Sequence, residues 1–194
     1  MSAGTLPAPT GAELRSLVVE GAAEAARVVG RLTGCDARLE ETLFLPRPAR
    51  AALTRLGGPG PELIAVGMDL QAPLGGSLVL LVDATHAERV AGALVPAAAA
   101  GSLDAEGESA LQELANIAGS AFVSTLARTL GGPMLHGVPR MARGRAGSCL
   151  DDLAGGAPGP AFAARLRCLD GPGMLLLLPD PRQMPEMARA LEEG

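Results

Sequence analysis

The chain has 194 residues and a formal net charge of −5, and 48% of its residues are hydrophobic, 19% charged and 2% aromatic. This composition supplies a core for one domain or two small halves, while the acidic balance and the scarce aromatics argue against nucleic-acid binding through phosphate contacts or base stacking. All 16 basic residues are arginine, which excludes the P-loop NTPases, pyridoxal enzymes and protein kinases that need a lysine.

Neither export nor membrane insertion is predicted. Residues 1–11 are rich in Ala, Gly and Pro, which indicates a flexible tail without the apolar segment of a signal peptide. The longest clean apolar runs, Leu78–Val82 and Met174–Leu178, are far shorter than a membrane span. The cysteines are Cys35, Cys149 and Cys168. Their wide spacing, without a CxxC pair, argues against a disulfide framework or a zinc ribbon and favours a cytoplasmic location.

The first half of the chain predicts a helix, three strands and a short helix. Good helix formers with periodic apolar residues indicate the helices, and alternating or wholly apolar runs bounded by Pro and Gly indicate the strands. The expected elements are helices at Ala12–Leu32 and Thr85–Leu94, with strands at Arg38–Pro46, Glu62–Leu70 and Ser77–Val82 between them. Asp83 or Thr85 is the expected N-cap of the second helix.

The same order of elements recurs in the second half. The expected elements are a long helix at Asp104–Leu130, a strand-like stretch at Met134–Arg143, strands at Ala161–Leu169 and Met174–Leu178 joined by a turn at Gly171–Gly173, and a closing helix at Asp180–Leu191. We therefore predict one domain at 12–191 made of two repeats, about 12–95 and 102–191. A pseudo-two-fold arrangement would join their hairpins into a largely antiparallel sheet with the two long helices on one face, an α+β fold. A generic α/β domain whose halves match by accident is the alternative.

A polar face on the long second helix is the feature that points to chemistry. At about 100° per residue, Ser109, Glu113 and Asn116 fall within about 60° of one another, opposite the apolar side of the helix. A carboxylate can bind a cation, and an amide has both a donor and an acceptor with which to orient a water. Neither group is a good nucleophile, and no histidine lies nearby in sequence. The pair therefore suits insertion into the active site of another protein.

The spacing of these residues resembles the signature of the CheC/CheX/FliY phosphatases of bacterial chemotaxis. That signature, Ser/Asp-x3-Glu-x2-Asn-x22-Pro, is matched by Ser109, Glu113, Asn116 and Pro139. The resemblance covers about residues 12–191, because the CheC fold is itself an internal duplication, and CheC is the member that this chain resembles most.

The first half keeps the frame of the motif without its asparagine. Ser16, Glu20 and Pro46 stand at the matching positions, and Ala23 replaces the asparagine. Because alanine has no amide with which to orient water, we expect this first site to be inactive, with Glu20 contributing only surface charge.

The resemblance implies a phosphatase that dephosphorylates the aspartyl-phosphate of a CheY-like response regulator. Asn116 would hold the attacking water and Glu113 would pair with the lysine of the receiver, while Ser109 and Pro139 would support the site. No cofactor of its own is expected, because the receiver supplies the Mg²⁺. A CheD-like deamidase is a further conceivable partner. The alternative is a non-catalytic protein of the same fold that binds response regulators or acts in a switch or scaffold.

The remaining polar residues give weaker predictions. His86 and His136 have no metal-ligand spacing and are expected on the surface or at helix caps. Arg140, Arg143 and Arg145 follow the motif and are expected on a solvated strand face, where they could also meet an acidic receiver.

Overall fold

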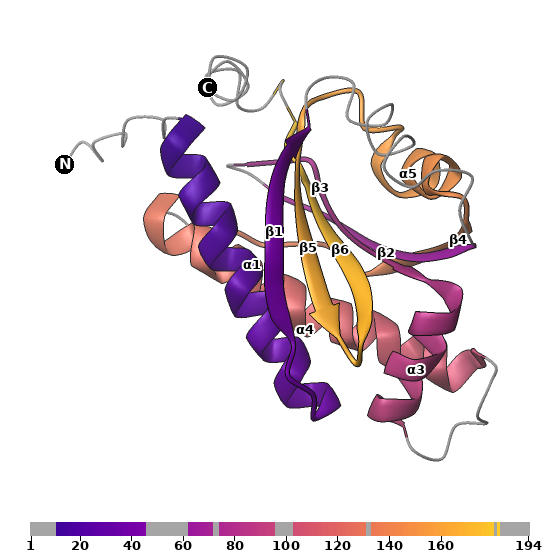
Figure 1. Cartoon of the computed structure of the whole chain (residues 1–194). Coiled ribbons are helices and arrows are strands. Elements are labelled where there is room, and N and C mark those ends of the chain that lie inside the picture. Colours follow the sequence, from indigo (N-terminus) through magenta and orange to yellow (C-terminus); the bar gives the residue numbers. More distant parts are fainter. Residues whose placement is uncertain are drawn as a thin grey trace.

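The fold has three layers, with a sheet between helices on both of its faces (Figure 1). The computed structural model describes residues 11–45, 62–71, 74–95, 103–130, 133–180 and 182. The helices are α1 (Gly11–Thr33), α3 (Ala84–Leu94), α4 (Ala105–Leu130) and α5 (Ala146–Ala154). The strands are β1 (Arg38–Leu45), β2 (Leu63–Asp69), β3 (Ser77–Asp83), β4 (Arg140–Gly144), β5 (Ala161–Cys168) and β6 (Gly171–Leu178). In this part of the chain, no helix has the length and apolar character needed to cross a bilayer.

The six described strands form one antiparallel sheet in the order β1-β5-β6-β3-β2-β4. The hairpins β2–β3 and β5–β6 meet at the centre, where Leu80 of β3 lies opposite Leu175 of β6. Each half lends its first strand to the other half, because β1 pairs with β5 and β4 pairs with β2. The predicted α+β fold with a pseudo-two-fold sheet is confirmed. The exchange of first strands was not predicted, because hydrophobic periodicity does not specify a pairing partner.

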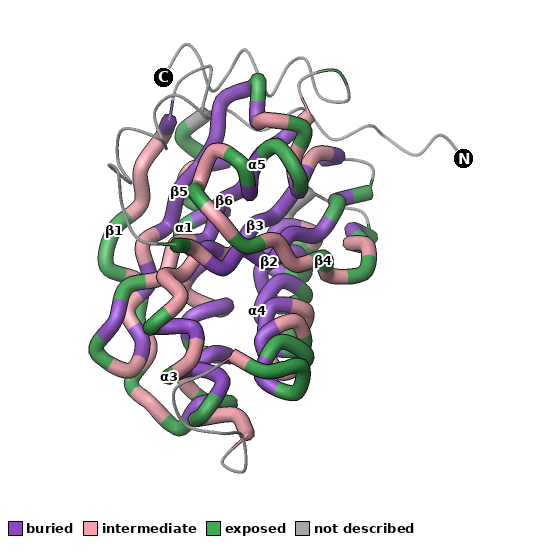
Figure 2. Tube along the Cα trace, turned by 90° about the vertical axis from the view of Figure 1, so that its right-hand side faces the viewer, coloured by how far each residue is buried: buried purple, intermediate pink, exposed green. Residues whose placement is uncertain are grey.

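Both faces of the sheet are buried, each against a different set of helices. One face packs against α1, α3 and α4, as predicted for the long helices, and the other packs against α5. Along β2 the side chains alternate between the faces, with Ile64 and Val66 toward the first set and Ala65 toward α5. Figure 2 shows the result on α4, whose buried positions face the interior of the molecule and whose exposed positions lie on the outer side.

Helix α5 was not predicted from the sequence. It has only nine residues and lies in a stretch rich in glycine, which masks its helical periodicity. It packs directly over Gly67 of β2, because a Cβ at that position would lie 2.9 Å from the Cβ of Leu153. Cys149 lies on the buried side of this helix, at 1% exposure, where it is a core residue.

Two predicted boundaries were wrong. The stretch Met134–Arg143 enters the sheet only from Arg140, apart from one bridge between Leu70 and His136, because Pro139 has no N–H with which to continue a ladder. The β5–β6 turn lies at Leu169 and Asp170, both at positive φ, so Gly171–Gly173 belongs to β6. The predicted tail at 1–11 falls outside the described residues up to position 10, since Gly11 begins α1. Most of the predicted closing helix, at 183–191, also falls outside them.

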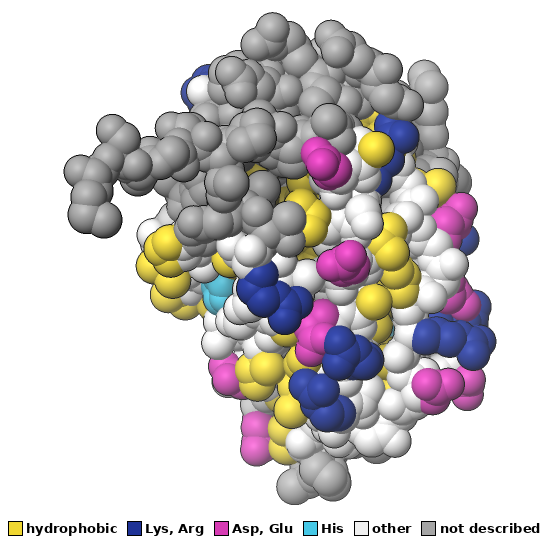
Figure 3. Space-filling view, turned by 90° about the vertical axis from the view of Figure 1, so that its left-hand side faces the viewer, with side chains coloured by type: hydrophobic (Ala, Val, Ile, Leu, Met, Phe, Trp, Pro, Cys, Tyr) yellow, Lys and Arg dark blue, Asp and Glu magenta, His cyan; other side chains and the backbone are white. Residues whose placement is uncertain are grey.

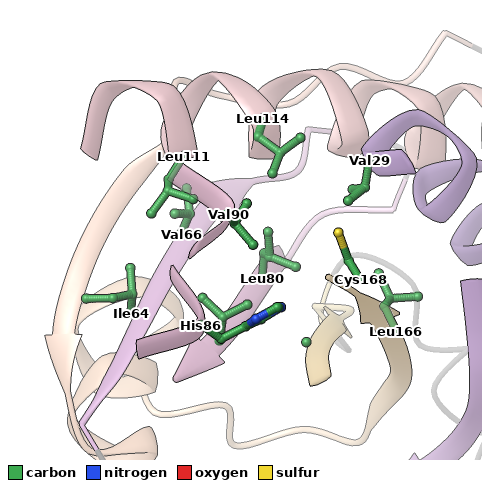
Figure 4. Close-up of a pocket in the computed structure, with 12 residues that line it drawn as sticks. Val29, Ile64, Val66, Leu80, His86, Val90, Leu111, Leu114, Leu166 and Cys168 are labelled. Atoms are coloured by element: carbon green, nitrogen blue, oxygen red, sulfur yellow. The ribbon is translucent and has the colours of Figure 1, made fainter. Parts of the chain in front are cut away.

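His86 lies at the capped start of α3 but is buried, which corrects the surface alternative of the expectation. Asp83 is the N-cap of α3 and accepts a 2.8 Å hydrogen bond from the backbone N–H of His86. The imidazole is 1% exposed, and its Nδ1 has no hydrogen-bond partner. It borders an apolar cavity of about 40 Å³ (Figure 4). Gly171 makes room for the ring, because a Cβ there would lie 2.2 Å from Nδ1.

Burial of His86 predicts a pH dependence of stability. Desolvation, and after it the positive charge of Arg89, lowers the pKa of His86, while Asp83 acts in the opposite direction. The unfolded chain therefore binds this proton more readily, so stability is present above the unfolded pKa of about 6.5 and is lost as pH falls below it. Urea unfolding at about pH 7.5 and about pH 5.0 is expected to show a larger acid-induced loss in the wild type than in His86→Gln. Equal losses in the two proteins would contradict this assignment.

Candidate functional site

Helix α4 presents the predicted polar face to solvent. Asp104 caps the helix by accepting a 2.8 Å hydrogen bond from the backbone N–H of Gly107. Glu106 and Glu108 in the first turn suit the positive end of the helix dipole. Further along, the apolar side chains are buried and the motif side chains face outward. The buried residues are Leu111, Leu114, Ala118 and Phe122, and the outward-facing ones are Ser109, Glu113, Asn116 and Ser120.

Two glycines let α4 approach its neighbours closely. A Cβ at Gly119 would lie 2.6 Å from Met68 Cε of β2, so the helix rests against the sheet at this point. A Cβ at Gly21 of α1 would lie 2.8 Å from Phe122 Cδ2, so the ring packs onto the backbone of α1. Packing on two sides holds the outward-facing residues of α4 on a rigid support.

The four motif residues meet around one open groove of about 430 Å³. Ser109, Glu113 and Asn116 line it from α4, and Pro139 lines it from the segment that leads into β4. The remaining lining residues are Gln112, His136, Gly137 and Val138. The 23 positions that separate Asn116 from Pro139 are therefore the path from the helix to the opposite wall of the groove.

The amide and the carboxylate of the motif touch each other only weakly. Asn116 Nδ2 donates to Glu113 Oε2 at 3.4 Å, which is long for a hydrogen bond. Glu113 is exposed and Asn116 is half-buried. Both groups therefore remain available to a partner that enters the groove.

His136 borders the groove, although no sequence signal pointed to it. Its Nε2 lies 2.8 Å from the Ser120 hydroxyl, one turn beyond Asn116 on α4, and its Nδ1 lies 3.0 Å from the carbonyl oxygen of Gly137. With Nδ1 protonated, the ring donates to Gly137 and accepts from Ser120. The contact joins α4 to the wall that carries Pro139. A spacing of 16 residues matches neither helical nor strand periodicity, so no pattern in the sequence predicted this contact.

The wall is also fixed to the sheet on its outer side. The N–H of Gly137 donates to the Asp69 carbonyl at 2.8 Å, and Arg140 pairs with the Asp69 carboxylate at 3.0 Å. Arg140 further donates to the carbonyl of Leu153 in α5 at 3.2 Å. Arg140 and Arg143, which pairs with Glu62 at 3.0 Å, thus have structural partners, as expected for a solvated strand face.

Ser120 and His136 are expected to be energetically coupled through their hydrogen bond. Ser120→Ala and His136→Ala each remove the same hydrogen bond, which contributes about 0.5–1.5 kcal/mol, so the double variant should lose less stability than the two single losses added together. Urea unfolding of the wild type and the three variants measures the coupling. If the losses in the free energy of unfolding were additive, the contact would not stabilise the segment that carries Pro139.

The first helix carries the copy of the motif that lacks the asparagine. On α1, Ser16 and Glu20 are exposed and Ala23 is half-buried. Its face of the molecule has interspersed acidic and arginine side chains (Figure 3). Pro46, the fourth position of the frame, lies outside the described residues.

Exposed apolar side chains lie in the α4 groove and beside it. Val138 is 84% exposed and lines the groove itself, and Leu135 of the same segment is 60% exposed. Ile117 of α4, next to Asn116, is 37% exposed. Exposed apolar side chains beside a polar groove are typical of a surface that meets another protein.

Solved structures show which known proteins share this fold, although no protein-family model and no curated protein sequence matches the chain. FliY of Thermotoga maritima is similar over 97% of this chain and 98% of its own, with a TM-score of 0.67 and 13% identity. For the FliM middle domain of H. pylori the coverage is 91% and 95%, the TM-score 0.61 and the identity 12%. A chain of the CheX–CheY–BeF3–Mg²⁺ complex from Borrelia burgdorferi is similar over 82% and 94%, with a TM-score of 0.58 and 18% identity. The chain therefore has the fold of the CheC/CheX/FliY group, as its motif predicted.

Proposed function

We propose that this chain docks on a CheY-like response regulator and hydrolyses its aspartyl-phosphate through helix α4. The observation that carries the proposal is the convergence of Ser109, Glu113, Asn116 and Pro139 on one exposed groove. A protein of this fold is known in a complex with CheY, BeF3 and Mg²⁺, which supports a receiver as the partner.

Asn116 is the catalytic residue in this proposal. Its amide oxygen accepts a hydrogen bond from a water and its amide nitrogen donates toward the phosphoryl group, so that the water is held in line with the bond to be broken. Water attacks phosphorus, the bond to the aspartyl oxygen breaks, and aspartate and inorganic phosphate are the products. The Mg²⁺ belongs to the phosphorylated receiver, which is the substrate.

Glu113 binds the receiver rather than the water. Its exposed carboxylate is three residues from Asn116 on the same helix face, so it can pair with a lysine of the receiver while Asn116 reaches the phosphoryl group. Val138 and Ile117 would bury their exposed apolar surface in the same contact. The groove thereby fixes the orientation in which the helix enters.

The first helix is inactive in this proposal because Ala23 offers no amide. Glu20 provides a matched control, since it occupies the equivalent position on α1. Glu113→Gln is expected to raise the Kd for a receiver trapped with BeF3 and Mg²⁺ at least about tenfold, about 1.4 kcal/mol, and Glu20→Gln to leave it unchanged. Titration calorimetry of the two variants provides the test, and equal effects would overturn the assignment to α4.

A non-catalytic binding protein is the second reading, and the likeness to the FliM middle domain favours it. Such a protein would show the same loss of affinity in Glu113→Gln without accelerating hydrolysis. Affinity and phosphate release must therefore both be measured to separate the two functions.

A further inference from the structure

We infer that Cys35 and Cys168 form an intramolecular disulfide when the chain meets a low-molecular-weight disulfide such as oxidised glutathione. The two Sγ atoms lie 2.7 Å apart although 133 residues separate the cysteines in sequence. Reaching the covalent S–S length of about 2.05 Å requires a movement of less than about 1 Å. Both cysteines are free thiols in the structure.

The strand exchange between the halves brings the two cysteines together. Cys35 lies in the turn between α1 and β1, and Cys168 is the last residue of β5. Because β1 pairs with β5, with Arg38 opposite Arg167, the start of one strand lies beside the end of the other. A disulfide here would join the end of α1 to the β5–β6 hairpin, and thus the first half to the second.

The surroundings leave room for the sulfurs to react. Cys35 is partly exposed, and Cys168 is 7% exposed. The Thr33 hydroxyl lies 3.1 Å from Cys35 Sγ and 3.5 Å from Cys168 Sγ. Cys168 also borders the cavity beside His86. Its sulfur points toward Val29 of α1 (Figure 4). The free volume next to this side chain allows it to shift without displacing the core.

The order of reaction follows from the two environments. Burial, together with the hydrogen bond to Cys35, raises the pKa of Cys168 to about 12, so this thiol stays protonated near neutral pH. The more exposed Cys35 therefore attacks oxidised glutathione first as a thiolate, forming a mixed disulfide and releasing one glutathione thiolate. The Cys168 sulfur then displaces the second glutathione, which leaves with the proton. The chain loses two electrons and two protons, and the oxidised glutathione becomes two molecules of reduced glutathione.

Peptide mapping tests the proposal on the full chain. The native wild type is incubated with oxidised glutathione, then denatured, alkylated and digested after arginine, which leaves each cysteine on a separate peptide. The expected product joins Leu32–Arg38 to Cys168–Arg182, with Cys149 alkylated. The cross-link is expected to raise Tm by roughly 5–15 °C, because it closes a long loop in the unfolded chain.

Three cysteine variants complete the test. Cys149→Ser should form the cross-link like the wild type, because Cys149 is buried against the other face of the sheet. Cys35→Ser should form none, and Cys168→Ser should stop at the mixed disulfide on Cys35. Three alkylated cysteines in the treated wild type, or a cross-link through Cys149, would overturn the proposal. The reaction does not require the α4 groove, so Asn116→Ala should form the same disulfide whether or not the proposed phosphatase activity exists.

Discussion

Asn116→Ala is expected to lower the turnover of a saturating phosphorylated receiver by about 10- to 1,000-fold, a loss of about 1.4–4 kcal/mol in transition-state stabilisation. The alanine keeps the helix, and Glu113 still binds the receiver, so KM should change little. What disappears is the amide that holds the water. The rate should then approach that of the receiver hydrolysing its own acyl phosphate.

Steady-state phosphate release at several receiver concentrations measures kcat and KM separately. Ser124→Ala is the matched control, because Ser124 is exposed on the same helix and does not line the groove. An Asn116→Ala enzyme with unchanged kcat and a raised KM would show that Asn116 contributes binding rather than water positioning.

Phe122→Ala is expected to have the largest effect on stability. The ring is 1% exposed and packs onto the backbone of α1 at Gly21, so its removal leaves a cavity between the two long helices. Losses for such substitutions are about 3–5 kcal/mol, which corresponds to a fall in Tm of roughly 6–20 °C for a chain of this size.

Thermal and urea unfolding measure this loss, with Ser124→Ala expected to stay within about 0.5 kcal/mol of the wild type. The cavity also loosens the support of Asn116, which lies six residues earlier on the helix. A loss below about 1 kcal/mol for Phe122→Ala would contradict the close packing of α4 on α1.

The sequence was informative where one element buries one regular face. The periodicity of α4 predicted both its extent and the polar face that carries Glu113 and Asn116, and the apolar run Leu78–Val82 predicted the central strand β3. In these elements the buried face and the local propensity agree, so the hydrophobic pattern along the chain is enough to predict the element. The joined sheet was predicted from the repeated order of elements in the two halves.

Features that depend on contacts between distant segments could not be predicted in this way. The exchange of β1 and β4 between the halves is a choice among pairing partners, which one strand's own pattern does not encode. Helix α5 is short and glycine-rich, and it is stabilised by packing over Gly67. The β5–β6 turn lies at Leu169 and Asp170, both at positive φ, and leucine rarely adopts such a φ, so its position was not predicted.

Some residues of the candidate site could be predicted from a linear pattern, and others could not. Ser109, Glu113, Asn116 and Pro139 were found because a linear spacing links them, and the structure brings them to one groove. His136 was not found, since only the folded wall places it beside Ser120. Likewise, the wide spacing of Cys35 and Cys168 argued against a disulfide framework, whereas strand pairing makes the two thiols neighbours.

Release of inorganic phosphate from a phosphorylated receiver of the same organism, with Mg²⁺ present, is the most direct test of the proposed phosphatase. The rate is measured at increasing concentrations of the wild type and of the double variant Glu113→Ala/Asn116→Ala. We predict that the wild type accelerates release in a saturable manner and that the double variant leaves the receiver at its intrinsic rate. No acceleration by the wild type, at concentrations where it binds the receiver, would contradict catalysis and leave a docking protein of the same fold.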